Sequence, residues 1–213
     1  MTRLTPTSYA LLALLSRRSW SAYELNKHMQ NSVLRAYWPR AESHVYSEPK
    51  KLVKAGLVTC TGEDGRGRVR TVYHITDEGR RRLQQWLAEP TESYAMQQFE
   101  GMVKFICADA GDCASLRRLL EDIRARALHD AAAALDGIQR VERDEIPEGE
   151  SGMPFNGLAI NFLIDHIESR IRWVDEVQGV LEQMEDTRDS AANRALGEIA
   201  YERALARLAD ILS

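Results

Sequence analysis

The sequence has few cysteines and no long apolar run, and each shortage excludes a class of protein. Its three cysteines (Cys60, Cys107 and Cys113) are an odd number among 213 residues, which fits reduced thiols in a cytoplasm better than a disulfide framework. The gap between Cys107 and Cys113, with no histidine nearby, is only a weak signal of a metal site. No segment approaches the roughly 20 apolar residues that cross a bilayer, and the first residues do not form a signal peptide. We therefore expect a cytoplasmic protein with no membrane segment and no metal site.

Enzyme signatures are also lacking. Ser47 and Lys50 match a Ser-x-x-Lys pattern, but the companion motifs of the serine enzymes that use it are missing. Gly62, Gly65 and Gly67 do not have the spacing of a dinucleotide-binding loop. The sequence therefore predicts a protein that is not an enzyme and that needs no cofactor.

The formal net charge of −4 combines two halves of opposite sign. Residues 1–90 carry 15 Lys and Arg against 8 Asp and Glu, a net charge of +7. Residues 91–213 carry 13 Lys and Arg against 24 Asp and Glu, a net charge of −11. A basic amino-terminal half favours a polyanionic partner, and the acidic half does not.

The basic half shows the element order of a winged helix-turn-helix. Thr5 is a good N-cap for a first helix. Ser21 and Glu24 have the spacing of a capping box, which predicts the start of a second helix. A third helix is expected over residues 41–55, ended by Gly56 as a left-handed cap.

A hairpin and a fourth helix follow in the pattern. Residues 57–61 and 69–75 have the composition of two strands, and residues 62–68 predict a glycine-rich loop with arginines at its tip. Thr76 is expected to cap a fourth helix that stops at Pro90.

The third helix and the hairpin carry the residues suited to DNA. Reading bases requires a short helix that projects into the major groove, while a basic wing reaches the minor groove or its phosphates. His44 and Ser47 suit base edges or phosphates, and the lysines suit phosphates, although a solvated helix face is the alternative for any single lysine. Val45, Tyr46, Leu52 and Val53 are expected to be packed. The predicted DNA-binding residues are Arg40, Ser43, His44, Ser47, Lys50, Lys51, Arg66, Arg68 and Arg70.

Residues 91–213 are predicted to be almost wholly helical. Apolar residues recur at alternating spacings of four and three in a helix expected over residues 156–185, a pattern typical of a coiled-coil seam. This helix has a second apolar stripe on the adjacent face, which favours a dimer over the alternative of an intrachain bundle in a monomer. The predicted dimerisation residues are Ile160, Ile164, Ile167, Ile171, Val174 and Leu181.

Aromatic residues are the candidates for an effector pocket at the domain junction or at the dimer interface. Aromatic residues at helical spacing are usually core, so this is the least specific of the sequence predictions. The candidates that we select are Trp38, Phe99, Phe162 and Trp173.

The motifs of the basic half resemble the PadR family of transcriptional regulators. They include Tyr23-Glu24-Leu25, Ser43-His44-Val45-Tyr46 and Tyr73-x-Ile75-Thr76-x-x-Gly79-Arg80. The resemblance is close over the first 90 residues and covers the rest in outline only. It implies a homodimer that binds palindromic operator DNA, commonly as a repressor relieved by a small molecule such as a phenolic acid. One departure is Pro49, since many members place this proline directly after the tyrosine.

These observations predict a mainly α (α+β) protein. A winged helix-turn-helix domain is expected in residues 1–90, and a helical dimerisation domain, which also carries the candidate effector pocket, in residues 91–213. The alternative is a winged-helix module that binds another protein and has no specific affinity for DNA.

Overall fold

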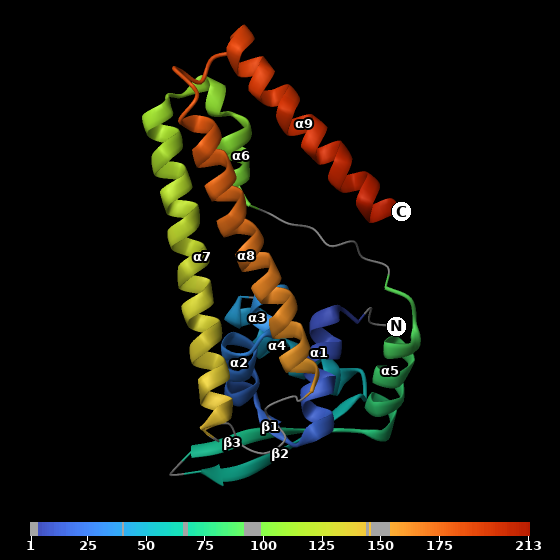
Figure 1. Cartoon of the computed structure of the whole chain (residues 1–213). Helices are drawn as coiled ribbons and strands as arrows, with labels where there is room; N and C mark the ends of the chain where they lie inside the picture. The colour runs from blue at the N-terminus through green and yellow to red at the C-terminus, as the bar shows by residue number, and fades with distance from the viewer. Residues whose placement is uncertain (1–3, 40, 66–67, 92–98, 144, 146–153) are drawn as a thin grey trace. The chain divides into compact units, whose positions relative to one another are not determined.

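A computed structural model describes residues 4–39, 41–65, 68–91, 99–143, 145 and 154–213 (Figure 1). These residues are mainly helical and contain one three-stranded sheet, which confirms the predicted fold class. The chain divides into two compact units. The first unit comprises Met1–Tyr94 with Gly137–Asn161, and the second comprises Ala95–Asp136 with Phe162–Ser213.

Helix α1 (Pro6–Arg17) begins as the sequence predicts. The Thr5 hydroxyl accepts a hydrogen bond from the Ser8 backbone N–H, and the Ser8 hydroxyl accepts one from the Thr5 N–H. This reciprocal cap satisfies two backbone donors that a helix start otherwise leaves unpaired. The buried side of α1 contributes Leu11, Leu12 and Leu15 to the core of the first unit.

Two short elements next to α2 (Ala22–Asn31) were not predicted from the sequence. Strand β1 (Trp20–Ser21) precedes α2, and the four-residue helix α3 (Leu34–Tyr37) follows it. Neither is long enough to show a periodic pattern of apolar residues, which is why the sequence does not reveal them. The capping box at the start of α2 is confirmed.

Helix α4 (Glu42–Lys54) occupies the position predicted for the third helix. It is continuous through Pro49, so the helix does not restart there. The Pro49 side chain is fully buried, because it lies on the side of the helix that packs on the core. Gly56 follows the helix with φ 72°, the left-handed conformation expected of its cap.

The wing is formed by strands β2 (Val58–Gly65) and β3 (Arg68–Ile75), and the sheet order is β1-β3-β2. The antiparallel register of β2 and β3 runs from Val58 opposite Ile75 to Gly65 opposite Arg68. The predicted loop over residues 62–68 is therefore too long, since residues 62–65 are paired strand. Residues 62–65 are glycines and acidic residues, which lack the apolar pattern of a strand. Their backbones pair nonetheless, because backbone hydrogen bonds do not require apolar side chains.

Helix α5 (Asp77–Ala88) closes the first unit's winged-helix core. Thr76 caps it through the Gly79 backbone N–H, as expected. Leu83 is buried, and the Trp86 ring stacks on Tyr9 of α1 with ring centroids 4.5 Å apart.

The described residues of the second unit form helices joined by short connections, of which residues 182–190 are the longest. The unit draws on α6 (Glu100–Ile106), the 3-10 turn η1 (Ala108–Ala110), α7 (Cys113–Glu142), α8 (Phe155–Leu181) and α9 (Ala191–Leu212). Its core joins α7 to α8 through Leu116, Leu120, Ile123, Val174 and Leu181. Ion pairs of Arg124 with Asp175 and of Arg170 with Asp130 connect the same two helices.

The predicted dimerisation seam divides into two sets. Ile167, Val174 and Leu181 are buried within the single chain, whereas Ile160, Ile164 and Ile171 are half-buried. Helix α9 has no buried side chain. Among the helices of the described residues, none is both long and apolar enough to span a membrane.

Gly79 is tightly enclosed where α5 meets the sheet. A Cβ at this position would overlap the Leu57 carbonyl oxygen and the Ile75 side chain. The same Leu57 carbonyl accepts the Thr76 N–H at 3.1 Å, so the backbone cannot move away without losing this bond.

We expect Gly79→Ala to lower the free energy of unfolding by about 1–3 kcal/mol, because overpacking against backbone outweighs the gain in helix propensity. Gly137→Ala in α7 is the matched control. Its Cβ would meet nothing within 4 Å, and we expect it to stabilise α7 by about 0.5–1 kcal/mol. Urea titrations followed by circular dichroism measure both. Equal effects of the two substitutions would contradict the steric argument.

Candidate DNA-binding interface

Helix α4 separates its side chains into two faces. Val45, Glu48, Pro49 and Leu52 are buried, at the spacings of three and four that place residues on one side of a helix. The opposite side is exposed and polar. It carries Ser43, His44, Tyr46, Ser47, Lys50, Lys51 and Lys54. The structure therefore brings all the described residues predicted on this helix onto one accessible surface.

Tyr46 differs from the sequence expectation. Its side chain was expected to be packed but is 38% exposed. Tyr46 is adjacent to the buried Val45, and one step along a helix turns the side chain by about 100°. Helical geometry therefore indicates that Val45 and Tyr46 cannot both point into the core. The Tyr46 hydroxyl adds a hydrogen-bond donor to the polar face.

A buried carboxylate anchors α4 to α1. Glu48 is 7% exposed, and its Oε1 accepts a hydrogen bond from the Ser8 hydroxyl at 2.5 Å. Its Oε2 accepts from Lys51 Nζ at 2.9 Å. A buried carboxylate is costly unless it is hydrogen-bonded and paired, and both conditions are met here. The contact fixes the rotation of α4 about its axis, and so decides which residues face outward.

The remaining predicted residues are Arg40, which precedes α4 in the sequence, and three arginines of the wing. Arg40 and Arg66 lie outside the described residues, as does the side chain of Arg68, whose backbone pairs with Gly65. Arg70 is described, and its guanidinium donates to Glu24 Oε2 at 2.6 Å. The structure thus places Arg70 against α2.

Glu24 is held by several donors at once. Burial raises the pKa of its carboxyl group, but hydrogen bonds from Ser21 and the charges of Arg70 and Arg18 outweigh burial, so the pKa lies below its ordinary value. The charged form of Glu24 is therefore the one that the fold stabilises.

His74 connects the base of the wing to its neighbours. Its Nδ1 lies 2.6 Å from the Ser19 hydroxyl, and its Nε2 lies 2.8 Å from the Thr61 hydroxyl. Hydroxyl groups can donate or accept, so both ring nitrogens are satisfied in either tautomer. Sequence reasoning missed this contact because its three residues are far apart along the chain.

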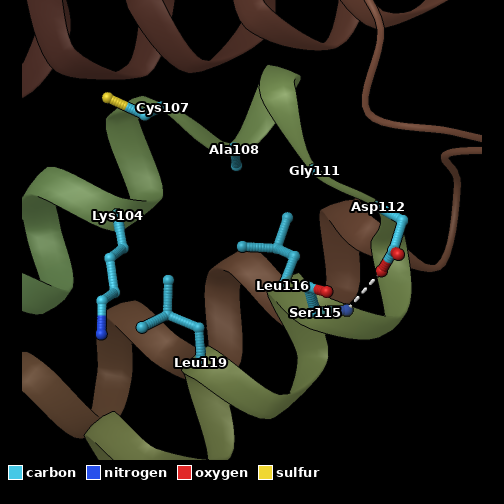
Figure 2. Close-up of a pocket in the computed structure, with 8 residues that line it drawn as sticks. All are labelled: Lys104, Cys107, Ala108, Gly111, Asp112, Ser115, Leu116 and Leu119. Carbon is cyan, nitrogen blue, oxygen red and sulfur yellow. Dashed lines mark hydrogen bonds between the residues drawn. The ribbon is translucent and has the colours of Figure 1, made fainter.

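The second unit contains two small cavities. The first, of about 220 Å³, is lined by residues of α6, η1 and the start of α7 (Figure 2). Lys104 contacts Glu100 at 2.8 Å, and Asp112 accepts the Ser115 N–H at 2.6 Å. None of the predicted effector residues lines this cavity.

The second cavity, of about 270 Å³, contains two of the four predicted effector residues. Phe99 and Trp173 line it together with His166, Arg170 and Arg172. Phe162 packs against His166 with ring centroids 4.8 Å apart. Trp38 lies in the first unit, where its indole N–H donates to the Thr7 hydroxyl at 2.9 Å.

Metal-ligating residues do not cluster in the described part of the chain. No group of three or more His, Cys, Asp or Glu residues there could hold a metal ion. All three cysteines are free thiols.

The fold and the exposed face of α4 define a winged helix-turn-helix protein of the DNA-binding class. Family models describe both parts of the chain. Residues 11–85 match the transcriptional regulator PadR-like family, and residues 100–182 match a model described as virulence activator alpha C-term. The chain belongs to the PadR family of transcriptional regulators.

Two curated relatives are transcriptional regulators by name. The chain is 32% identical over 80 residues to the negative transcriptional regulator PadR of Bacillus subtilis, which covers 37% of this chain and 43% of that relative. This match therefore spans less than half of the relative's length. This chain is also 26% identical over 188 residues to the probable transcriptional regulator Rv1176c of Mycobacterium tuberculosis. That match covers 82% of this chain and 97% of the relative.

Solved structures share the fold. Bacillus subtilis PadR in complex with operator DNA superposes with a TM-score of 0.72 at 18% identity, covering 83% of this chain and 99% of that chain. The same Bacillus subtilis protein in complex with p-coumaric acid gives 0.67 at 19% identity, covering 85% and 100%. At these identities the likeness establishes the architecture alone.

Proposed function

We propose that this protein is a homodimeric repressor that binds palindromic operator DNA and is released from it by a small aromatic effector. The observation that supports DNA binding is the polar face of α4. This face points away from the core because the buried Glu48 fixes the rotation of the helix against α1. A helix presented in this way fits the major groove, which is about 12 Å wide. The relatives named above are regulators, and the first of them is a negative regulator by name.

Each part of the interface has a distinct role in this proposal. His44 and Ser47 would meet base edges, while Lys50 would meet a phosphate. Lys51 would make a weaker phosphate contact, because its Nζ is also paired with Glu48 at 2.9 Å. Arg66 and Arg68 stay predictions for the wing tip, and Arg40 stays one for the start of α4. The competing proposal, a winged helix that binds another protein, predicts no affinity for DNA beyond that of any basic surface.

Lys50 offers the sharpest test of the phosphate contacts. It is exposed on the polar face of α4, and a lysine that neutralises one phosphate releases about one counterion. We expect Lys50→Ala to weaken binding to DNA from upstream of the protein's own gene and to reduce the slope of log affinity against log salt by about one unit. Fluorescence anisotropy over a salt series measures this slope.

The control for Lys50 is Lys104→Ala, which removes a lysine of α6 in the second unit and should leave the slope unchanged. Identical slopes for the wild type and Lys50→Ala would remove this face of α4 from the interface. Equal affinity of the wild type for upstream and random DNA would favour the protein-binding alternative.

Dimerisation is proposed to use surfaces that the single chain leaves uncovered. Ile167, Val174 and Leu181 of the predicted seam are already buried within the chain, so their replacement would also disturb the second unit itself. Helix α9 is different because its large apolar side chains are exposed. They are Ile199, Tyr201, Leu205, Leu208, Ile211 and Leu212. Tyr201, Leu205, Leu208 and Leu212 share one helix face by their spacing of four, three and four.

We expect the double substitution Leu205→Glu with Leu208→Glu to convert the dimer to a monomer, because charges on an apolar interface are strongly unfavourable. Sedimentation velocity measures the mass. Glu202→Gln, on the polar side of the same helix, is the control that should stay dimeric. A dimer that persists in the double variant at micromolar concentration would exclude α9 from the interface.

The effector is proposed to bind in the second cavity. Phe99 and Trp173 offer aromatic surfaces, and Arg172 offers positive charge, whereas Arg170 is already paired with Asp130 at 2.7 Å. An aromatic surface beside an arginine suits a small aromatic carboxylate. A volume of about 270 Å³ lies at the lower end of ligand pockets and favours a ligand with one ring. Bacillus subtilis PadR has been solved with p-coumaric acid, which has this chemistry.

p-Coumaric acid is therefore the first probe. We expect Arg172→Ala to weaken its binding by about tenfold, because a carboxylate would lose a charged partner. Isothermal titration calorimetry measures the affinity, with Arg117→Ala on the exposed surface of α7 as the control. Unchanged affinity in Arg172→Ala, or no heat of binding to the wild type, would reject this ligand at this cavity.

A further inference from the structure

Arg70 lies on β3 just beyond the two residues that pair with the short strand β1. Strand β1 has only two residues, Trp20 and Ser21, which pair with Tyr73 and Val72 of β3. The chain then enters α2, so the ladder between β1 and β3 does not reach Arg70. At this point a side-chain contact continues the connection, because the Arg70 guanidinium donates to Glu24 of α2 at 2.6 Å.

The acceptor of this bond is fixed by other contacts. Glu24 Oε2 also accepts from the Ser21 backbone N–H at 2.8 Å and from the Ser21 hydroxyl at 2.8 Å. Arg18 lies 3.8 Å from Glu24 Oε1, and its guanidinium stacks 3.6 Å above the ring of Trp20. Arg70 therefore meets a carboxylate whose position is set by the cap of α2.

We propose that Arg70 is a positioning residue that ties the wing to the start of α2, and that it is not a phosphate contact. This inference rests on the DNA-binding function proposed above and deepens it. A phosphate would compete with the Glu24 carboxylate for the Arg70 guanidinium and would draw it away from α2. That carboxylate would lose its nearest charged partner while it is only 25% exposed.

The position of Arg70 explains why such a tie matters. Arg70 is two residues from Arg68, where the paired part of β3 begins. Strands rise about 3.3 Å per residue, so Arg70 holds the hairpin within about 7 Å of the end of its ladder. A tie at this place sets the direction of the wing tip relative to α2 and, through the shared core, relative to α4. Losing it would loosen every contact that the tip makes.

The two roles of Arg70 predict opposite results for a change at Glu24. If Arg70 bound a phosphate, Glu24→Gln would free the guanidinium and strengthen binding to DNA. If Arg70 positions the wing, Glu24→Gln weakens binding. Glutamine serves as well as glutamate in a capping box, so this substitution removes the charge and leaves the start of α2 intact.

The experiment measures affinity for the upstream DNA over a salt series for Arg70→Ala, Glu24→Gln and the double variant. We expect each single variant to bind about fivefold more weakly, with the salt slope of the wild type. The double variant should be no weaker than the weaker single variant, because both changes break one contact. Arg117→Ala, an exposed arginine of the second unit, is the control for loss of positive charge.

Two results would overturn the proposal. One is a salt slope that falls by about one unit in Arg70→Ala, as expected for a lost phosphate contact. The other is binding by Glu24→Gln that is as tight as the wild type or tighter. If Arg70→Ala does not fold by circular dichroism, Arg70→Gln takes its place in the same measurements.

A second readout does not depend on DNA. Amide hydrogen exchange should quicken at residues 70–72 of β3 in both Arg70→Ala and Glu24→Gln, because the tie is lost in each. If the wild type showed no affinity for DNA, the DNA-binding function would fail, and exchange alone would decide whether Arg70 holds the wing. Unchanged exchange in both variants would refute the positioning role.

Discussion

The presentation of α4 depends on how one side of this helix is buried. Val45, Pro49 and Leu52 supply the apolar contacts, and Glu48 adds a charged group that is tolerated only because Ser8 and Lys51 satisfy it. Apolar contacts alone would allow some rotation about the helix axis. A directional hydrogen bond from α1 removes that freedom, so the polar face that includes His44, Ser47 and Lys50 is presented in one orientation.

Capping residues at helix starts in the first unit also make hydrogen bonds to other elements. Ser8 belongs to the cap of α1 and also bonds to Glu48 of α4. Glu24 belongs to the capping box of α2 and also receives Arg70 from the wing. In both cases a residue with a local role carries a long-range contact. Helix α4 and the wing are thereby fixed to the apolar core of the first unit.

The second unit follows a different principle. Its buried core lies between α7 and α8, with Phe99 and Phe105 packed against it. Large apolar side chains remain exposed on α8 and α9, among them Phe162, Leu205 and Leu208. A chain that buries so little of its apolar surface gains much from covering it. The proposed dimer follows from this imbalance, and the cavity lined by Phe99 and Trp173 is the proposed ligand site of the same unit.

Local chemistry in the sequence determined the helix starts at Thr5, Ser21 and Thr76 and the end of α4 at Gly56. It also determined the wing strands and the amphipathic pattern of α7 and α8. Caps and periodicity act between near neighbours in the chain, so the sequence alone is enough to show them. The sequence did not reveal β1, α3, the full length of the wing ladder, the exposure of Tyr46 or the partner of Arg70. Those depend on contacts between residues distant in the chain, such as Ser8 with Glu48 and Arg70 with Glu24. Only the tertiary structure decides them, since hydrogen bonds and ion pairs form where folding brings donor and acceptor together and leave no periodic trace in the sequence.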